Sequence, residues 1–432
     1  MFRVTHSFTL LFVSGIALGQ SFDPKPIYKT SDLCQNAISS GFQVSADGHI
    51  YNKSDISRLA DISPILPELK RLRLAFKSNG IDIIPIVIPL RGMLPESMPV
   101  NEGDYEARQK DYSDFITLYR KLGFTLPDVL EYTKGIQLWR PFFIHGDHHI
   151  TQYGASIISA SLDLTLKSLK SYQDIPEADF ITTRMPDKII SPDHQSRSIQ
   201  SLDWLCNEKA KIHDDTMDEF ETSETSQVGL LDDITQPAIA LFGTSQSGPD
   251  YNLRGFIKQI SSRDVLDGGH IGAGGAYLSM QEYLLSPEYQ IQKPKIVIWE
   301  FALEEVQEKR EGDVPQFTDQ QIYKQLIPSI YGECEAKSFS SSGSRLELET
   351  NPKPNSYSYV VINYADLSKK DIAITANLSN GKMYVDNVHQ SNKIVSRGRI
   401  FVELPAMLDY SKKIEINMPG NVKGFTAKIC QI

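Results

Sequence analysis

The sequence predicts an α/β domain with a mainly parallel sheet, followed by a C-terminal β-sandwich. Over the N-terminal two thirds of the chain, strand-like and helix-like segments alternate, which is typical of a parallel sheet covered by helices. After about Tyr331 short alternating runs separated by turn residues take over, which is typical of a sandwich. The 432 residues are enough for two or three domains, and 41% hydrophobic and 23% charged residues are ordinary for a globular protein.

The first twenty residues have the features of a secretory signal peptide. Arg3 and His6 precede an apolar stretch from Phe8 to Leu18, and small residues stand before a cleavage point after Gly19. A membrane anchor is the alternative, but about 11 apolar residues are short for a bilayer span. We therefore expect residues 1–19 to be removed and the mature chain to be exported and soluble.

The α/β part is expected to begin with an amphipathic helix over residues 57–78. The near-continuous apolar run Ile81–Leu90 predicts a strand buried on both faces, in which Pro85 indicates a bulge or a sheet edge. The acidic stretch 208–233 is interpreted as an exposed, irregular insertion. Further downstream the pattern predicts the helices Thr151–Tyr172, Leu253–Ser261 and Ala276–Leu285 and the strands Pro237–Phe242 and Lys295–Phe301.

The last hundred residues predict the β-sandwich. Asn380-Gly381 is a strong hairpin signal between two of the expected strands. The expected strands are Ser356–Ile362, Asp371–Ala376, Lys382–Val385, Arg399–Leu404, Ile414–Met418 and Phe425–Cys430. We expect the chain to divide into residues 20–330 and residues 331–432.

Charge separates these two parts. The whole chain carries a net charge of −10, which argues against a general affinity for nucleic acid or for an anionic membrane. From Tyr331 onward, however, 13 Lys and Arg face 10 Asp and Glu, so this part is +3. The tail is therefore a mildly basic module on an acidic body.

The four cysteines agree with export. They are widely spaced and none forms a CxxC pair, which disfavours a zinc knuckle or a redox motif. In an oxidising compartment we expect two disulfides, for which four cysteines allow three connectivities. The simplest pairing joins Cys34 with Cys206 and Cys334 with Cys430, and would staple two separate domains.

Two clusters contain residues that could act chemically: FFIHGDHHIT at 142–151 and ALFGTSQSGPDYN at 240–252. Ser245 stands on a tight turn at the carboxyl end of an expected buried strand, where α/β folds bind ligands. A serine hydroxyl needs a base to take its proton, and the base needs an orienting acceptor. Asp147 and His149 are two residues apart on an extended loop, so both can point to the same side.

Each cluster also has other interpretations. Gly-Thr-Ser is common in turns, so Ser245 alone is a weak signal. The histidine cluster could be a metal site, since histidine and aspartate are both good ligands. It could also be a solvated loop, in which Asp147 caps the helix beginning at Thr151. From the residues alone, a catalytic triad, a metal site and a structural loop all remain open.

Together, the two clusters resemble the periplasmic alginate O-acetyltransferases, an SGNH hydrolase-like family. Residues 147–155 resemble its D-x-H-W-T-x-x-G-A signature, although Ile150 stands in place of the usual tryptophan. Gly243-Thr244-Ser245 resembles the G-T-S nucleophile block of the same family. The resemblance extends from about Cys34 to the C-terminus. It includes the four cysteines and the two-part layout of the AlgX type, which carries a C-terminal carbohydrate-binding module.

The resemblance implies a catalytic triad, two oxyanion donors and neither cofactor nor metal. The residues that it implies are Ser245 as the nucleophile, His149 as the general base, Asp147 as its orienting carboxylate, and Asn252 and Gly274 as oxyanion donors. His148 beside the expected base leaves open which imidazole acts.

The function implied is transfer of acetyl groups, through an acyl-serine, to hydroxyls of a secreted anionic polysaccharide such as a uronate polymer. The expected partners are this polysaccharide and an acetyl donor delivered by a membrane-bound or periplasmic acetylation protein, and the expected compartment is the periplasm. A carbohydrate esterase with the same triad and a non-catalytic polysaccharide-binding scaffold are the alternatives.

Four residues of the basic module are expected to bind the polymer: Lys382, Tyr384, Arg397 and Arg399. Tyr384 alternates with Lys382 and would offer its ring to a sugar on the same face. The other interpretation is that these charges only keep an edge strand from aggregating.

Overall fold

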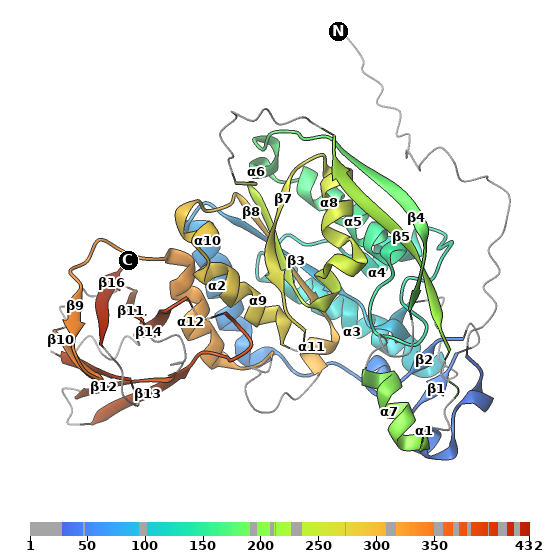
Figure 1. Cartoon of the computed structure of the whole chain (residues 1–432), viewed down its shortest axis with the longest axis horizontal. Coiled ribbons are helices and arrows are strands. Elements are labelled where there is room, and N and C mark those ends of the chain that lie inside the picture. The colour runs from blue at the N-terminus through green and yellow to red at the C-terminus, as the bar shows by residue number, and fades with distance from the viewer. Residues whose placement is uncertain are drawn as a thin grey trace, which may run out of the picture.

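The structure, a computed structural model, describes the chain from residue 28 to residue 432. Within this range it leaves out residues 46–47, 95–101, 191–196, 208–210, 212, 226–235, 273, 308–316, 350–356, 366–370, 378–381, 396, 405–412 and 419–423. Figure 1 shows an α/β body in the centre, a β-sandwich at one end and a small lobe at the other. The expected signal peptide, residues 1–19, lies outside the described residues.

A four-stranded parallel sheet forms the centre of the body. Its strands are β3 (Asp82–Ile88), β8 (Ile296–Ala302), β6 (Ile239–Gly243) and β7 (Val265–His270), in that spatial order. Nearly every residue of β3, β6 and β8 is buried, as their continuous apolar runs predict for a sheet covered on both faces. The strand containing Pro85 lies at the edge of the sheet, as the proline indicates.

Helices cover both faces of this sheet (Figure 1). On one face pack α2 (Leu66–Ser78), α9 (Gly275–Leu285) and α12 (Gln320–Tyr331), and on the other α4 (Val129–Lys134), α5 (Gln152–Lys167) and α8 (Leu253–Ser261). Helix α2 begins at Leu66 and not at residue 57 as expected. Pro64 and Pro67 explain the shorter helix, because proline favours the first turn of a helix and not its interior.

The remaining elements of the body and the small lobe are one long helix, residues 102–121, which buries Tyr112, Phe115 and Tyr119 in the main core, and several shorter elements. They are α1 (Gln35–Ser39), α3 (Glu102–Lys121), α6 (Lys170–Gln173), α7 (Arg197–Cys206), α10 (Pro287–Ile291), α11 (Glu304–Gln307), β1 (Gln43–Val44) and β2 (Ile50–Tyr51).

The expectation of an irregular insertion at 208–233 is wrong. This stretch contains β5 (Asp215–Glu224), which pairs antiparallel with β4 (Phe180–Ile190). Most of its acidic side chains are partly or fully exposed, and Asp218 pairs with Arg184 of β4 at 2.9 Å. Met217 and Asp215 are buried, and Asp215 accepts a hydrogen bond from the N–H of His145 at 2.8 Å. A charged strand of this kind is stabilised by its partner strand, so its own composition does not reveal it.

The small lobe is joined by the first disulfide. Cys34 at the start of α1 is bonded to Cys206 at the end of α7. The two helices pack around a separate apolar cluster that contains Leu33, Phe42 and Leu202. The bond has the expected pairing, and it links the N-terminal segment to the body.

The C-terminal part is a sandwich of two antiparallel four-stranded sheets with its own core. Asn377 pairs with Met383 across the predicted hairpin, whose Asn380-Gly381 turn lies outside the described residues. The short β9 and β10 were not expected. In spatial order the strands are β10 (Arg345–Glu349), β15 (Lys413–Asn417), β12 (Asp371–Asn377) and β13 (Met383–His389) in one sheet, and β14 (Arg399–Leu404), β11 (Ser358–Tyr364), β16 (Phe425–Gln431) and β9 (Phe339–Ser341) in the other.

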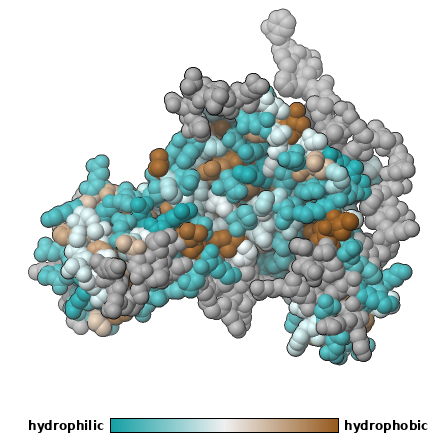
Figure 2. Space-filling model, viewed as in Figure 1, coloured by the Kyte–Doolittle hydropathy of each residue, from teal (hydrophilic) through white to brown (hydrophobic). Residues whose placement is uncertain are grey.

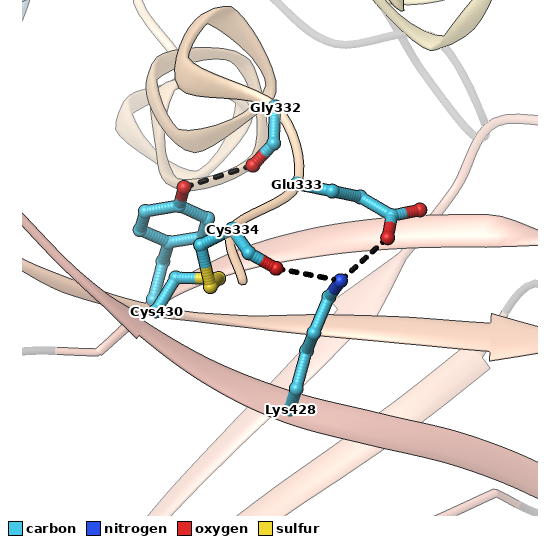
Figure 3. The surroundings of a disulfide bond; sticks show 6 residues. Gly332, Glu333, Cys334, Lys428 and Cys430 are labelled. Atoms are coloured by element: carbon cyan, nitrogen blue, oxygen red, sulfur yellow. Dashed lines mark hydrogen bonds and ion pairs between the residues drawn. A yellow bond between two sulfur atoms is a disulfide. The ribbon is translucent and has the colours of Figure 1, made fainter. Parts of the chain in front are cut away.

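The junction between body and sandwich combines covalent, polar and apolar contacts. The second disulfide, with the expected pairing, joins Cys334 to Cys430 on β16 (Figure 3). Lys428 of the same strand donates to Glu333 (2.6 Å) and to the Cys334 carbonyl (2.9 Å). Buried apolar residues of α9, such as Leu278, pack against the sheet that contains β11 and β14. The architecture changes after α12, and we propose residue 331 as the domain boundary.

The surface in Figure 2 is mainly hydrophilic, with small separate hydrophobic patches on the face in view. Among the residues that the structure describes, no helix is both long and apolar enough to cross a bilayer.

Candidate active site

Ser245 lies on a tight turn at the carboxyl end of β6. The strand ends at Gly243, and Ser245 begins a single 3-10 turn, Ser245–Ser247, that Thr244 caps by accepting a hydrogen bond from Gln246 N–H. Only glycine fits at position 243, because a Cβ there would overlap the Glu300 carboxylate on β8. Ser245 is half-buried and reaches the surface at the end of the sheet where its helices begin.

The loop 142–151 contains Asp147 and His149. An isolated bridge between Phe143 and Ile150 closes the loop, and His149 O accepts from Ile144 N–H at 3.0 Å. Thr151 then caps α5 by accepting from Gly154 N–H at 3.0 Å. The helix cap therefore belongs to Thr151, which leaves Asp147 for another role.

Asp147, His149 and Ser245 form one hydrogen-bonded chain. His149 Nδ1 lies 2.9 Å from Asp147 Oδ1, and His149 Nε2 lies 2.8 Å from Ser245 Oγ. Because an ionised carboxylate only accepts, Nδ1 carries the proton and Nε2 accepts from the serine hydroxyl. The structure thus brings together the three residues expected to form a triad, in the geometry of a nucleophile, a base and an orienting acceptor.

The Asp147 carboxylate is poised to remain ionised. Burial raises its pKa, but the hydrogen bond and charge of His149, together with the charge of His148, outweigh burial and lower the pKa to about 2. Its side chain is 2% exposed, so water screens these interactions very little. A permanent negative charge here would stabilise an imidazolium at His149.

Arg91 holds the loop from behind. It is buried, and its guanidinium forms an ion pair with Asp55 (2.9 Å). Nη1 also donates to the main-chain carbonyls of Ile144 (3.2 Å), His145 (3.3 Å) and Asp147 (2.7 Å). One fixed cation therefore satisfies three carbonyls of the turn that contains Asp147. No sequence motif marks Arg91 or Asp55 for this role.

His148 does not contact Ser245. Its Nδ1 lies 3.2 Å from Asp147 Oδ1, and its ring is tilted by 32° against that of His149 at a centroid distance of 4.1 Å. Ligand atoms of Asp147, His148 and His149 are close enough to hold a metal ion. Both nitrogens of His149 are, however, already engaged by Asp147 and Ser245, so a metal would have to replace those hydrogen bonds. The donor set therefore fits the triad better than a metal.

Tyr251 covers the imidazole of His149. Its ring is stacked on the His149 imidazole at 5.0 Å with an interplanar angle of 11°. Burial raises the pKa of Tyr251, so its hydroxyl stays neutral. The ring limits the access of water to one face of His149.

Glu300 is a buried carboxylate behind the turn of residues 244–247, which we call the nucleophile turn. The sequence motifs did not indicate a role for this residue. It lies on β8 and accepts from Thr244 N–H (2.8 Å), Thr244 Oγ1 (2.9 Å) and Ser247 Oγ (2.8 Å). Burial raises its pKa; the three donors lower it, the charge of Glu305 raises it again, and the resulting pKa is about 7. The sequence did offer one signal, because Glu300 is a charged residue within an otherwise apolar strand. A buried glutamate is rare unless it has a bonding partner.

This raised pKa predicts a pH-dependent stability. The folded protein keeps the Glu300 proton between pH 4.5 and about 7, where the unfolded chain has lost it, so the contribution of Glu300 to stability declines as pH rises through this range. Between pH 5 and pH 8, we expect the free energy of unfolding of the wild type to fall by up to about 3 kcal/mol relative to that of Glu300→Gln. Urea unfolding of both proteins measures this difference. The exposed Glu335→Gln serves as control, and a gap that does not change with pH would contradict the prediction.

Both expected oxyanion donors make a hydrogen bond elsewhere in the structure. The Gly274 N–H already donates to Glu305 at 3.1 Å, and Asn252 Nδ2 donates to Thr222 at 3.2 Å. To stabilise an oxyanion, the Gly274 N–H would have to leave Glu305, whereas Asn252 Nδ2 carries a second N–H; both roles stay predictions. Gly272 lies against the nucleophile instead, since a Cβ built there would be 3.9 Å from Ser245 Cβ. The run of glycines in this loop did not show which one faces Ser245.

The four residues expected to bind polysaccharide do not form one patch. Lys382 immediately precedes β13, whereas Gln390, which follows β13, donates to the Arg399 carbonyl at 3.4 Å. The seven residues of β13 therefore place these two cations at opposite ends of a strand of roughly 20 Å. Arg399 is also held by Glu333 (2.8 Å), while Lys382 and Arg397 are exposed.

Tyr384 is less available than expected for stacking on a sugar. It is half-buried, and its hydroxyl donates to Asp386 at 2.8 Å, to which Lys324 of α12 also binds at 3.0 Å. A hollow of about 510 Å³ lies elsewhere in the same sheet. It is lined by none of the four residues but by others that include Asp371, Asn387, His389 and Asn417.

Comparison with known proteins shows to which family the chain belongs. The chain matches the family model described as the SGNH hydrolase-like domain of acetyltransferase AlgX over residues 48–303, more than half of its length. It is 27% identical to the alginate biosynthesis protein AlgX of Pseudomonas syringae pv. tomato over 393 residues, which cover 84% of this chain and 78% of the relative. It is 24% identical to the probable alginate O-acetylase AlgJ of Azotobacter vinelandii, covering 54% and 60%.

Solved structures agree on the fold. Pseudomonas aeruginosa AlgX superposes with a TM-score of 0.74 at 24% identity, covering 93% of this chain and 99% of that one. The O-acetyltransferase domain of Pseudomonas putida AlgJ gives 0.51 at 18% identity, covering 66% and 98%. The first match includes the C-terminal part, so the α/β body and the sandwich occur together in both proteins.

Proposed function

The chain belongs to the AlgX family of SGNH hydrolase-like acetyltransferase domains, and on this premise we propose that it transfers acetyl groups through Ser245 to hydroxyls of an anionic polysaccharide. The observation that supports this most directly is the continuous hydrogen-bonded chain from Asp147 through His149 to Ser245. The names of its relatives, alginate biosynthesis protein and probable alginate O-acetylase, favour a uronate polymer of the alginate kind as the acceptor.

In the first half-reaction, Ser245 Oγ attacks the acetyl carbonyl of the donor while His149 Nε2 accepts the hydroxyl proton. Asp147 stays ionised and stabilises the imidazolium. The bond from the acetyl carbon to the donor then breaks, and His149 gives its proton to the leaving group. We assign stabilisation of the oxyanion to the N–H groups of Ser245 and Gly272, because Gly272 lies against Ser245.

In the second half-reaction, a sugar hydroxyl takes the place of the donor. His149 accepts the proton of this hydroxyl as its oxygen attacks the acetyl-serine, and returns a proton to Ser245 Oγ when the acyl bond breaks. Transfer requires the sugar to compete with water for the acetyl-serine. The Tyr251 ring on His149 favours this outcome, since it restricts water on one side of the base.

We propose that the chain acts in the periplasm, where an acetylation partner supplies the donor. The apolar N-terminal stretch supports export, and both disulfides suit an oxidising compartment. We also propose that the sandwich binds the polymer. The exposed Lys382 and Arg397 would then supply separate positive charges, and the hollow lined by Asn387 and Asn417 would supply hydrogen-bonding groups.

One assay tests this proposal against its alternatives. Purified protein is incubated with an acetyl-ester donor and a deacetylated polyuronate oligosaccharide, and the products are analysed by mass spectrometry. We expect acetylated oligosaccharide. Free acetate alone would identify an esterase, and binding of the oligosaccharide without turnover of the donor would identify a non-catalytic scaffold.

A further inference from the structure

Gln246, the residue after the proposed nucleophile, connects the two segments of the triad. Its side chain is 2% exposed and reaches across to the loop 142–151. Nε2 donates to the carbonyl of His148 at 3.0 Å, and Oε1 accepts from the N–H of Ile150 at 2.8 Å. These two backbone groups lie directly on either side of His149. The side-chain amide of Gln246 therefore connects the nucleophile turn to the main chain on both sides of His149.

The other end of this connection is also fixed. The N–H of Gln246 donates to Thr244 Oγ1 at 3.3 Å, and the Thr244 hydroxyl donates to the buried Glu300 at 2.9 Å. The contacts thus run without a break from β8, through the nucleophile turn, to the backbone of His149. Because an amide is planar, its two bonds set the orientation of the loop as well as its distance.

We infer that Gln246 is a positioning residue that keeps the His149 imidazole in register with Ser245 Oγ. This inference rests on the proposed function, which makes the bond between these two side chains the path of the proton. The Gln246 side chain is 2% exposed, and its hydrogen bonds go to the backbone of the loop and not to the reacting atoms. We therefore expect its effect on kcat and not on the KM of either substrate.

The physical reason is the cost of leaving buried backbone groups unpaired. Without the amide, His148 O and Ile150 N–H lose their partners inside the protein, and the loop can satisfy them only by moving toward water. Such a movement takes His149 away from Ser245. Since a misplacement of about 1 Å can cost about 100-fold in rate, we expect kcat to fall by about 10- to 100-fold.

The test replaces Gln246 by methionine, which keeps the length of the side chain and removes both hydrogen bonds. Gln325→Met is the matched control. Gln325 is also buried (6% exposed), accepts from Gln281 at 2.8 Å and donates to the His389 carbonyl at 3.0 Å, but it lies on α12 where this helix meets α9 and the sandwich. Both variants lose two buried hydrogen bonds, so both should be destabilised. Only Gln246→Met should lose kcat, with KM within about 2-fold of the wild type.

A second measurement separates this inference from the proposed function. A fluorophosphonate labels a serine in proportion to its activation by the base, and requires neither polysaccharide nor acetyl donor. Labelling should be about 10- to 100-fold slower in Gln246→Met and unchanged in Gln325→Met. Gln246→Glu, which can accept from Ile150 but cannot donate to His148, provides a second variant and should also be slower.

Equal labelling rates for the wild type and a folded Gln246 variant would overturn the inference, as would an equal loss of rate in Gln325→Met. If the wild type is labelled rapidly but transfers no acetyl group, the proposed function fails while the role of Gln246 can still be measured.

Discussion

Replacement of Ser245 by alanine is expected to abolish acetyl transfer while the fold stays intact. The side chain is half-buried on a turn, so its oxygen contributes little to packing. Its loss removes the proposed nucleophile, whose oxygen is hydrogen-bonded to His149. We expect kcat to fall by at least about 10³-fold in the oligosaccharide assay. The melting temperature should change by no more than a few degrees.

Ser168→Ala provides the matched control for this measurement. Ser168 is exposed at the end of α5 and donates only to the carbonyl of Thr165, at 2.6 Å. Its removal should leave transfer unchanged. If Ser245→Ala retains substantial transfer, the acyl-serine mechanism is wrong and direct attack by the sugar hydroxyl must be considered.

The two adjacent histidines should differ widely in their effect. His149→Ala removes both the proton acceptor of Ser245 and the partner of Asp147, so we expect a loss of at least about 10³-fold in kcat. His148→Ala removes a 3.2 Å contact with Asp147 and a ring tilted against that of His149, and should cost less than about 10-fold in kcat.

These variants control for one another, because each deletes an imidazole from the same loop. The kcat of both is measured under the same conditions, with circular dichroism as a check on folding. A larger loss in His148→Ala than in His149→Ala would show that the base has been assigned to the wrong ring.

Much of the fold could be predicted because burial leaves a periodic pattern. The apolar runs that became β3, β6 and β8 indicated a covered sheet, and Pro85 indicated its edge. Strand β5 was not predicted, because its stability comes from pairing with β4 and not from its own acidic residues. The prolines before α2 were visible, yet the apolar spacing continued through them and led to a helix that was too long.

The hydrogen-bonded set of Asp147, His149 and Ser245 could be predicted because these residues stand in short motifs, but the groups that position them could not. Arg91 and Glu300 come from segments far from both motifs, and only the fold places them behind Asp147 and Ser245. The four residues expected to bind polysaccharide were predicted to lie together, and the structure separates them for a related reason. Alternation along one strand predicts a shared face, but it says nothing about which end of a sandwich a neighbouring strand reaches.

The spatial order of the central sheet has a consequence for how activity arises during synthesis. Strand β8 lies between β3 and β6, yet it is the last of the four to leave the ribosome. A nascent chain that ends before β8 already contains Asp147, His149 and Ser245, but lacks the strand that joins the edge strand to the rest of the sheet and supplies Glu300. Pairings between such distant segments form slowly, because the chain between them must first be ordered. We therefore expect the site to be complete only after β8 has paired with β3 and β6. A nascent chain should be inactive before that step.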